Sequence, residues 1–235
     1  MQGMLRWRWL AAAVAALVGA TACSSVVTGG DESEPELACE AGPGRVTLHR
    51  LNRTEYNNTV RDLLGVDLRP AERFPQDDLG HGFDNIADVL TVAPILVEKY
   101  GEAAAELAAA ALADRDARAK LIPCDPAKMG EEACARESLG TFLKRAFRRP
   151  LEDGELDGFL ALFAAARKDG GTFDESIGVA VEAALLSPHF LFRVEEEPTG
   201  AVRKLDGWEV ATRLSYFLWS TMPDDALFEA AESGR

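Results

Sequence analysis

The sequence is poor in the residues that mark redox cofactors and metal arrays. Its 235 residues include four cysteines and three histidines, and the pattern Cys-x-x-Cys-His does not occur. These counts argue against a cysteine-rich metal array and against covalent c-type haem within this chain. Basic residues are also few, because 25 Lys and Arg stand against 39 Asp and Glu, for a net charge of −14. A phosphate backbone would repel so acidic a chain, so nucleic acid is not an expected partner.

The N-terminal apolar run is too short to cross a membrane. It spans residues 10–18 (LAAAVAALV), about half of the ~20 residues that a transmembrane helix needs. The run follows Arg6 and Arg8 and leads through small residues to Cys23. This order is typical of a secretory signal, and the cysteine that follows it resembles the lipobox of bacterial lipoproteins. We therefore expect residues 1–22 to be a lipoprotein signal peptide and Cys23 to carry the lipid, with ordinary cleavage and a free thiol as the alternative.

Small, acidic, proline and glycine residues dominate 23–44, which predicts a flexible acidic tether. The expected product is an exported, membrane-anchored lipoprotein that faces the periplasm or the cell exterior, with the outer membrane favoured. Export implies an oxidising environment in which disulfides persist. Cys124 and Cys134 enclose nine residues, a loop that a disulfide can close. Cys39, in the tether, is left without an assigned partner.

Helical periodicity dominates the rest of the chain. Apolar residues recur at three- and four-residue spacing through most of 45–235. Asn52, Thr172 and Asp206 are each followed three residues later by Glu, the capping-box pattern of a helix start. Strands and helices do not alternate along the chain. The predicted fold class is therefore all-α, with amphipathic helices packed in bundle-like modules and at most a short hairpin.

Further boundaries and core faces follow from the same pattern. One helix is expected to open at Thr91, and Pro223 is expected in the first turn of the last helix. Residues 190–195 and 202–205 flank a turn at 198–200, so they form either the hairpin or a linker. Aromatic residues fall mainly on the apolar stripes, so no sugar-stacking surface is evident. The main stripes expected in the core are Val92, Leu96, Tyr100, Ala103, Leu107 and Ala110; Leu139, Phe142, Leu143 and Phe147; Leu156, Phe159, Leu160 and Phe163; Phe173, Ile177, Val181 and Ala184; and Val210, Leu214, Phe217 and Leu218.

Several short motifs occur together along the helical region: LNRTEYNNTVRDLLG at 51–65, GFDN at 82–85, RAFRRP at 145–150, LSPHFL at 186–191, RLSYFLW at 213–219 and MPDD at 222–225. As a set they resemble the planctomycete cytochrome-associated domain proteins, which are also found in myxobacteria. The resemblance implies a first helical module at 45–122, a second at 123–200 and the truncated start of a third at 201–235. It further implies an N-terminal fragment of a longer protein, in which c-type haem belongs only to downstream domains. Function in the family is largely undefined, so no catalytic residue carries over.

An Asp-rich loop at 66–88 interrupts the helical pattern. Asp77, Asp78 and Asp84 offer oxygen ligands that suit Ca²⁺ in an exported protein, although their spacing is not that of an EF-hand. The simpler interpretation is that Asp and Asn side chains in this loop form turns and cap helices. A carboxylate pair for polysaccharide hydrolysis is a third interpretation.

Two other features admit two interpretations each. His189 follows Pro188 at a helix end and is either a packed residue or a ligand of a metal or haem. A basic cluster near the end of one helix either docks an acidic partner or, as we prefer, pairs with acids just beyond Pro150. The basic residues are Lys144, Arg145, Arg148 and Arg149, and the acids are Glu152, Asp153 and Glu155.

The leading hypothesis is an envelope-anchored lipoprotein module of a haem-associated multidomain protein, which binds or scaffolds rather than catalyses. Its expected partners are the membrane and redox or envelope proteins. The alternative is an enzyme that acts on extracellular or envelope polysaccharide through the Asp-rich loop.

Overall fold

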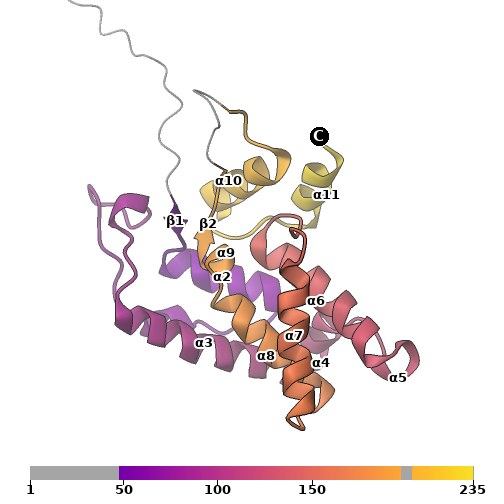
Figure 1. Cartoon of the computed structure of the whole chain (residues 1–235). Coiled ribbons are helices and arrows are strands. Elements are labelled where there is room, and N and C mark those ends of the chain that lie inside the picture. Colours follow the sequence, from indigo (N-terminus) through magenta and orange to yellow (C-terminus); the bar gives the residue numbers. More distant parts are fainter. Residues whose placement is uncertain (1–47, 197–202, 235) are drawn as a thin grey trace, which may run out of the picture. The chain divides into compact units, whose positions relative to one another are not determined.

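The structure, a computed structural model, describes residues 48–196 and 203–234 (Figure 1). The described residues belong to one compact unit, Gly44–Arg235. The expected signal peptide, the lipid site Cys23, the tether with Cys39 and the turn at 198–200 lie outside the described residues. Among the residues that are described, no helix is both long and apolar enough to cross a membrane.

The described chain is helical, as the sequence predicts. The α-helices are α2 (Arg53–Leu64), α3 (Pro94–Ala113), α4 (Arg115–Leu121), α5 (Pro126–Met129), α6 (Glu131–Phe147), α7 (Glu155–Lys168), α8 (Phe173–Leu185), α9 (Pro188–Leu191), α10 (Gly207–Trp219) and α11 (Asp225–Ser233). Two short 3₁₀ helices, η1 (Pro70–Arg73) and η2 (Ala87–Val89), lie between α2 and α3. The strands β1 (His49–Arg50) and β2 (Phe192–Arg193) have two residues each.

Local capping signals set several of these boundaries. The predicted capping boxes at Asn52, Thr172 and Asp206 are confirmed, with the reciprocal side-chain and backbone hydrogen bonds present in each. The helix start expected at Thr91 is wrong, because α3 begins at Pro94. The residue before a proline is disfavoured in helical conformation, and Ala93 is accordingly extended, with ψ 152°. The expectation that Pro223 lies in the first turn of the last helix is also wrong, because Asp224 caps α11 after it.

One hydrophobic core draws residues from α2, α3, α4, α6, α7, α8 and α9. Helix α8 lies between α3 and α7 and also contacts α6 (Figure 1). Small residues on α3, such as Ala104 and Ala108, are fully buried and allow α8 to approach closely. This core crosses the boundary expected at residue 122, so the first two predicted modules pack as one unit.

The strand pairing is long-range. Strands β1 and β2 are antiparallel, with His49 opposite Arg193 and Arg50 opposite Phe192. The Leu51 N–H extends the contact by donating to the Leu191 carbonyl oxygen at 2.9 Å. Of the two interpretations of 190–195, the hairpin with 202–205 does not hold for β2, which pairs with the segment just before α2.

Helix α10 has its apolar stripe on the outside. Val210, Leu214, Phe217 and Leu218 are 42–84% exposed, so their expected place in the core is wrong. Ala211, Ser215 and Tyr216 are buried instead, and Tyr216 is the α10 residue that joins the main core among the described residues. Periodicity identified which residues share a face, but it carries no information on which face meets the core.

Candidate functional site

A buried carboxylate at the start of α2 is the centre of the most polar part of the interior. Glu55 is 4% exposed, and its Oε2 accepts the Asn52 backbone N–H at 3.0 Å. Its carboxylate also lies 3.6 Å from Arg193 Nη2 and 3.9 Å from His49 Nε2. Burial raises the pKa of Glu55, while Arg193 and the Asn52 N–H act in the opposite direction. A helix cap therefore also links the start of α2 to the β1–β2 pair.

His49 and Arg193 lie opposite each other on the two strands and form one wall of a pocket. Burial, followed by the charges of Arg193 and Arg50, lowers the pKa of His49 to about 4, so the imidazole is neutral at pH 7. His49 Nε2 and Arg193 Nε are both buried and have no hydrogen-bond partner among the described residues. This strand pair therefore carries polar atoms whose hydrogen-bonding capacity is unused.

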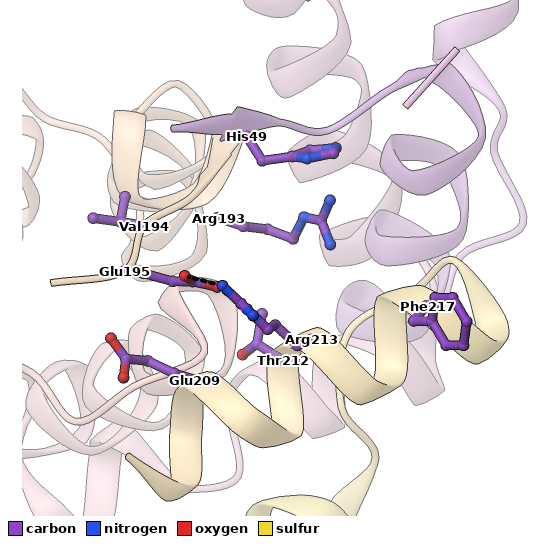
Figure 2. A pocket seen from close by; sticks show the side chains of 8 residues that line it. All are labelled: His49, Arg193, Val194, Glu195, Glu209, Thr212, Arg213 and Phe217. Atoms are coloured by element: carbon purple, nitrogen blue, oxygen red, sulfur yellow. Dashed lines mark hydrogen bonds and ion pairs between the residues drawn. The ribbon is translucent and has the colours of Figure 1, made fainter. Parts of the chain in front are cut away.

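The pocket has a volume of about 370 Å³ and opens between the strand pair and α10 (Figure 2). Glu195 and Arg213 form an ion pair across it, with distances of 2.5 and 2.6 Å. Glu209 accepts hydrogen bonds from Arg203 and from the backbone N–H of Glu196 at 3.0 Å. The complete lining is His49, Arg193, Val194, Glu195, Glu209, Thr212, Arg213 and Phe217.

Arg148 connects the core helices to this region. It occupies the left-handed C-cap of α6, with φ 58°, and is 3% exposed. Its Nη2 donates to the carbonyl oxygens of His189, Phe190 and Phe192 at 2.8–3.0 Å. Its guanidinium also lies 5.7 Å from the centre of the Tyr216 ring. The pairing of Arg148 with the acids beyond Pro150 is wrong, because its buried guanidinium donates to backbone carbonyl oxygens instead.

The rest of the basic cluster pairs in two directions. Arg149 pairs with Glu155 at 2.7 Å and with Glu152 at 3.8 Å, as the preferred internal pairing predicts. Lys144 and Arg145 instead pair with acids of α11, Glu232 and Asp225. These acids lie about eighty residues along the chain, so proximity in sequence gave no indication of them.

The His189 side chain is 45% exposed, and one side of its ring lies against the core. Its ring centre lies 5.4 Å from that of Phe147, and its Nε2 lies 3.7 Å from the Glu155 carboxylate. Its backbone carbonyl accepts from Arg148. These contacts fit the structural interpretation of His189.

The Asp-rich loop is tied to the start of α2. Asp77 accepts Arg50 Nη2 at 2.7 Å and the Arg53 backbone N–H at 2.8 Å, so it caps α2 from outside the helix. Asp84 accepts the Asn52 side-chain amide at 3.3 Å, whereas Asp78 is exposed. Within residues 48–196 and 203–234, no three His, Cys, Asp or Glu side chains form a group that could hold a metal ion. The geometry therefore matches the capping interpretation, and the Ca²⁺ expectation for these three Asp residues gains no support from it.

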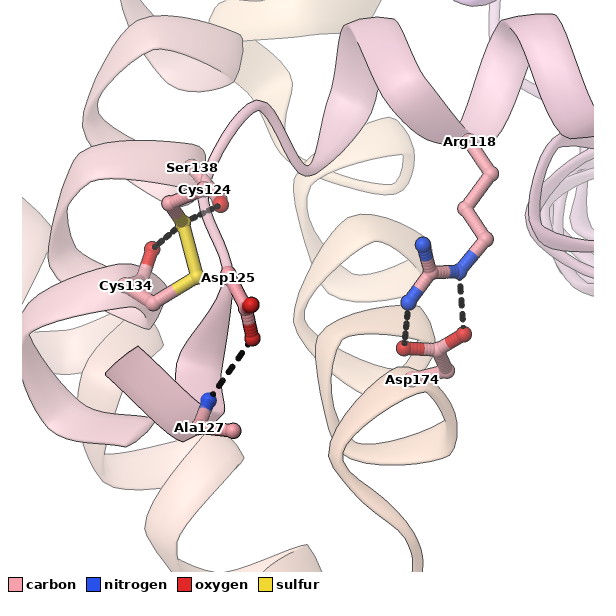
Figure 3. Close-up of a disulfide and its surroundings, with 7 residues drawn as sticks. All are labelled: Arg118, Cys124, Asp125, Ala127, Cys134, Ser138 and Asp174. Atoms are coloured by element: carbon pink, nitrogen blue, oxygen red, sulfur yellow. Dashed lines mark hydrogen bonds and ion pairs between the residues drawn. A yellow bond between two sulfur atoms is a disulfide. The ribbon is translucent and has the colours of Figure 1, made fainter. Parts of the chain in front are cut away.

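The predicted disulfide between Cys124 and Cys134 is confirmed, with Cα atoms 5.6 Å apart (Figure 3). Cys134 is fully buried in α6, so the bridge fixes the segment containing α5 to the core. Nearby, Arg118 of α4 forms a bidentate pair with Asp174 of α8, at 2.5 and 2.7 Å. Both links hold the region where the first predicted module meets the second.

Three family models match the chain in succession. PSD3, described as a protein of unknown function (DUF1587), matches residues 49–113; PSD5 (DUF1595) matches 134–195; and PSD4 (DUF1592) matches 205–235. All three are planctomycete cytochrome-associated domain families of unknown function. The chain belongs to these families. No curated protein and no solved structure matches it.

The buried polar region is a place where the three matched segments meet. Residues Asn52, Glu55 and Thr59 come from the first, Arg148 and Arg193 from the second, and Tyr216 from the third. The motifs that carry the sequence resemblance include most of these residues. The capping box indicated Glu55, whereas no local signal indicated Arg50, His49 or Arg193, because the β1–β2 pairing that positions them is long-range.

Proposed function

We propose that this chain is a binding and scaffolding module of an exported lipoprotein, and that a redox or haem-carrying envelope protein docks on the outer face of α10. The observation that carries the proposal is the exposed apolar stripe of that helix. Phe217 is 84% exposed and Trp219 58%, beside Val210, Leu214 and Leu218. The partner class comes from the cytochrome association of the families.

The size of this face supports a docking role. With side chains of ~150–250 Å² each, the exposed fractions leave on the order of 500 Å² of apolar surface on one helix. The largest apolar patch on a typical monomer covers ~300–600 Å², and such patches often mark interaction sites. A standard interface buries ~800 Å² per partner, so this face would form the greater part of one.

The spacing of the stripe specifies the kind of partner surface. Val210, Leu214, Phe217 and Leu218 follow the i, i+4, i+7, i+8 pattern of a helix seam. An amphipathic helix laid along α10 would bury both stripes together, the helix-in-groove mode of recognition. We therefore assign the docking element of the partner to an amphipathic helix.

The Asp-rich loop favours this function over polysaccharide hydrolysis. A catalytic pair needs one free carboxylate beside the bond to be cleaved and one proton donor. Asp77 instead shares its two oxygens between Arg50 and the Arg53 N–H. This use of Asp77 supports a structural loop next to the binding module.

The anchor in the proposal rests on the sequence around Cys23. Several acyl chains on one cysteine hold a protein firmly, whereas a single chain is marginal. In cells that process lipoproteins, Cys23→Ala is expected to move the protein from the membrane fraction to the soluble fraction, while Cys39→Ala stays with the membrane. Equal membrane retention of both variants would contradict the lipid anchor. It would leave the proposal of the docking face unaffected.

The docking face is tested by placing a benzoyl-phenylalanine photo-crosslinker at Phe217 of the full chain in its native envelope. The matched control is the same probe at Phe83, an aromatic residue that is 62% exposed on the Asp-rich loop. We expect Phe217 to crosslink to a helical peptide of a haem-carrying protein, identified by mass spectrometry, and Phe83 not to. Crosslinks from Phe217 only to another copy of the chain, or the same products from both positions, would overturn the proposal.

A further inference from the structure

The guanidinium of Arg193 is largely buried and lies 5.0 Å from the centre of the Tyr216 ring. Its side chain is 17% exposed, and its Nε is buried with no hydrogen-bond partner among residues 48–196 and 203–234. Its nearest carboxylate, Glu55, lies at 3.6 Å, outside hydrogen-bond distance, and that carboxylate also caps α2. A guanidinium offers five N–H donors, and buried donors are normally paired. Arg193 therefore has unused capacity to bind an acceptor.

The other charges of the pocket are already matched. Arg213 and Glu195 pair with each other, and Glu209 is held by Arg203 and by backbone N–H groups. His49 is neutral at pH 7 and adds no charge. Among the described lining residues, the charge left without a hydrogen-bonded counterpart is the cation of Arg193, so the pocket favours an anionic group.

The shape of the donor selects the anion. A guanidinium presents parallel N–H groups that match the two oxygens of a planar carboxylate. Figure 2 shows the Arg193 side chain extended beside that of His49, on the opposite side of the pocket from Thr212 of α10. A volume of about 370 Å³ is at the small end of the range for ligand sites. The apolar parts of Val194 and Phe217 line the same space.

We propose that this pocket binds the carboxylate of a small organic acid, held by Arg193 in the space between the strand pair and α10. The carboxylate would supply the hydrogen-bond acceptors that Arg193 lacks, and the body of the acid would rest against Val194 and Phe217. The site shares Phe217 with the proposed docking face, but the residue that holds the carboxylate, Arg193, lies outside that face.

The probe is benzoate, with benzamide as a neutral control of the same shape, and the binding is measured by NMR titration of the purified chain. Benzoate is expected to bind at least tenfold more tightly than benzamide, because charge-assisted hydrogen bonds are the stronger kind. Arg193→Gln is expected to weaken benzoate binding by tenfold or more, while Arg118→Gln, in an ion pair outside the pocket, leaves it unchanged. Inorganic phosphate should compete poorly.

A second variant tests the proposal independently if Arg193→Gln does not fold. Thr212→Phe leaves Arg193 in place but fills the pocket from the α10 side, and it is expected to block benzoate binding as well. Bound benzoate should also raise the pKa of His49, because a nearby negative charge favours the imidazolium. Equal affinity for benzoate and benzamide, phosphate binding as tightly as benzoate, or full benzoate affinity in a folded Arg193→Gln or Thr212→Phe variant would overturn the proposal.

Discussion

The hydroxyl groups of Thr59 and Tyr216 lie 2.8 Å apart in the interior, although 157 positions separate the two residues in the sequence. The bond joins α2 to α10 and so ties the third matched segment to the first. Arg148 Nη1 also donates to the Tyr216 hydroxyl at 3.4 Å, and the Arg193 guanidinium lies 5.0 Å from the ring centre. Tyr216 is thus a residue at which all three matched segments meet.

Removal of the Tyr216 hydroxyl should therefore be costly. Tyr216→Phe leaves Thr59 without its partner in a buried site, and we expect a loss of ~1–3 kcal/mol in the free energy of unfolding. Tyr56→Phe is the matched control, because the buried Tyr56 hydroxyl has no hydrogen-bond partner among the described residues, and its removal should cost little. Urea unfolding of both variants measures the difference, and equal losses would contradict the assigned role of Tyr216.

Arg148 should contribute far more to the stability of the fold than the neighbouring Arg149. Arg148→Gln removes a buried cation and leaves three carbonyl oxygens without their hydrogen-bond donor. We expect it to lower the free energy of unfolding by ~3 kcal/mol or more. Arg149→Gln breaks a partly exposed ion pair and should cost about 1 kcal/mol or less. Thermal and urea unfolding of the two variants provide the comparison. A loss for Arg148→Gln no larger than that for Arg149→Gln would show that the carbonyl contacts contribute little.

His49 should make the folded state sensitive to acid. In the unfolded chain the imidazole takes up a proton near pH 6.5, whereas burial keeps it neutral in the fold down to about pH 4. The unfolded state therefore binds more protons between these values, and His49 lowers stability as the pH falls through this window. At ~1.4 kcal/mol per pH unit, the contribution between pH 6.5 and pH 5 is ~2 kcal/mol.

The measurement is urea unfolding of the wild-type chain and of His49→Gln at pH 7 and pH 5. The wild type should lose ~2 kcal/mol more than the variant over this range. Glu55 acts in the opposite sense, because its raised pKa removes stability as the pH rises through that pKa, and both chains share this effect. An identical pH dependence in the two chains would contradict the buried, neutral state of His49.

The disulfide should stabilise the α5 region by restricting the unfolded chain. Reduction of the Cys124–Cys134 bridge is expected to lower the free energy of unfolding by ~2–3 kcal/mol. This is the entropic contribution of closing a loop of this size in the unfolded chain. Unfolding with and without a reductant measures it. A variant with serine at both positions should show no response to the reductant, and a wild type that is equally indifferent would contradict a stabilising bridge.

Features encoded within a few residues could be predicted from the sequence, and features that depend on distant partners could not. The Asn52–Glu55 capping box is a local signal and was predicted together with the helix that it starts. Arg148 lies next to a predicted helix end, yet its burial depends on carbonyl oxygens some forty residues away. The exposure of the apolar stripe on α10 could not be predicted for the same reason. Phe217 has the spacing of a core residue whether or not a neighbour covers it.

Hydroxyl-radical footprinting tests whether a partner covers the outer face of α10. The labelling of Phe217 and Trp219 would be compared between intact envelopes and the purified full chain, with the exposed Phe83 as the internal reference. We expect Phe217 and Trp219 to be protected in envelopes relative to the purified chain, and Phe83 to react equally in both. Equal labelling of Phe217 and Trp219 in the two samples would contradict the proposed docking face.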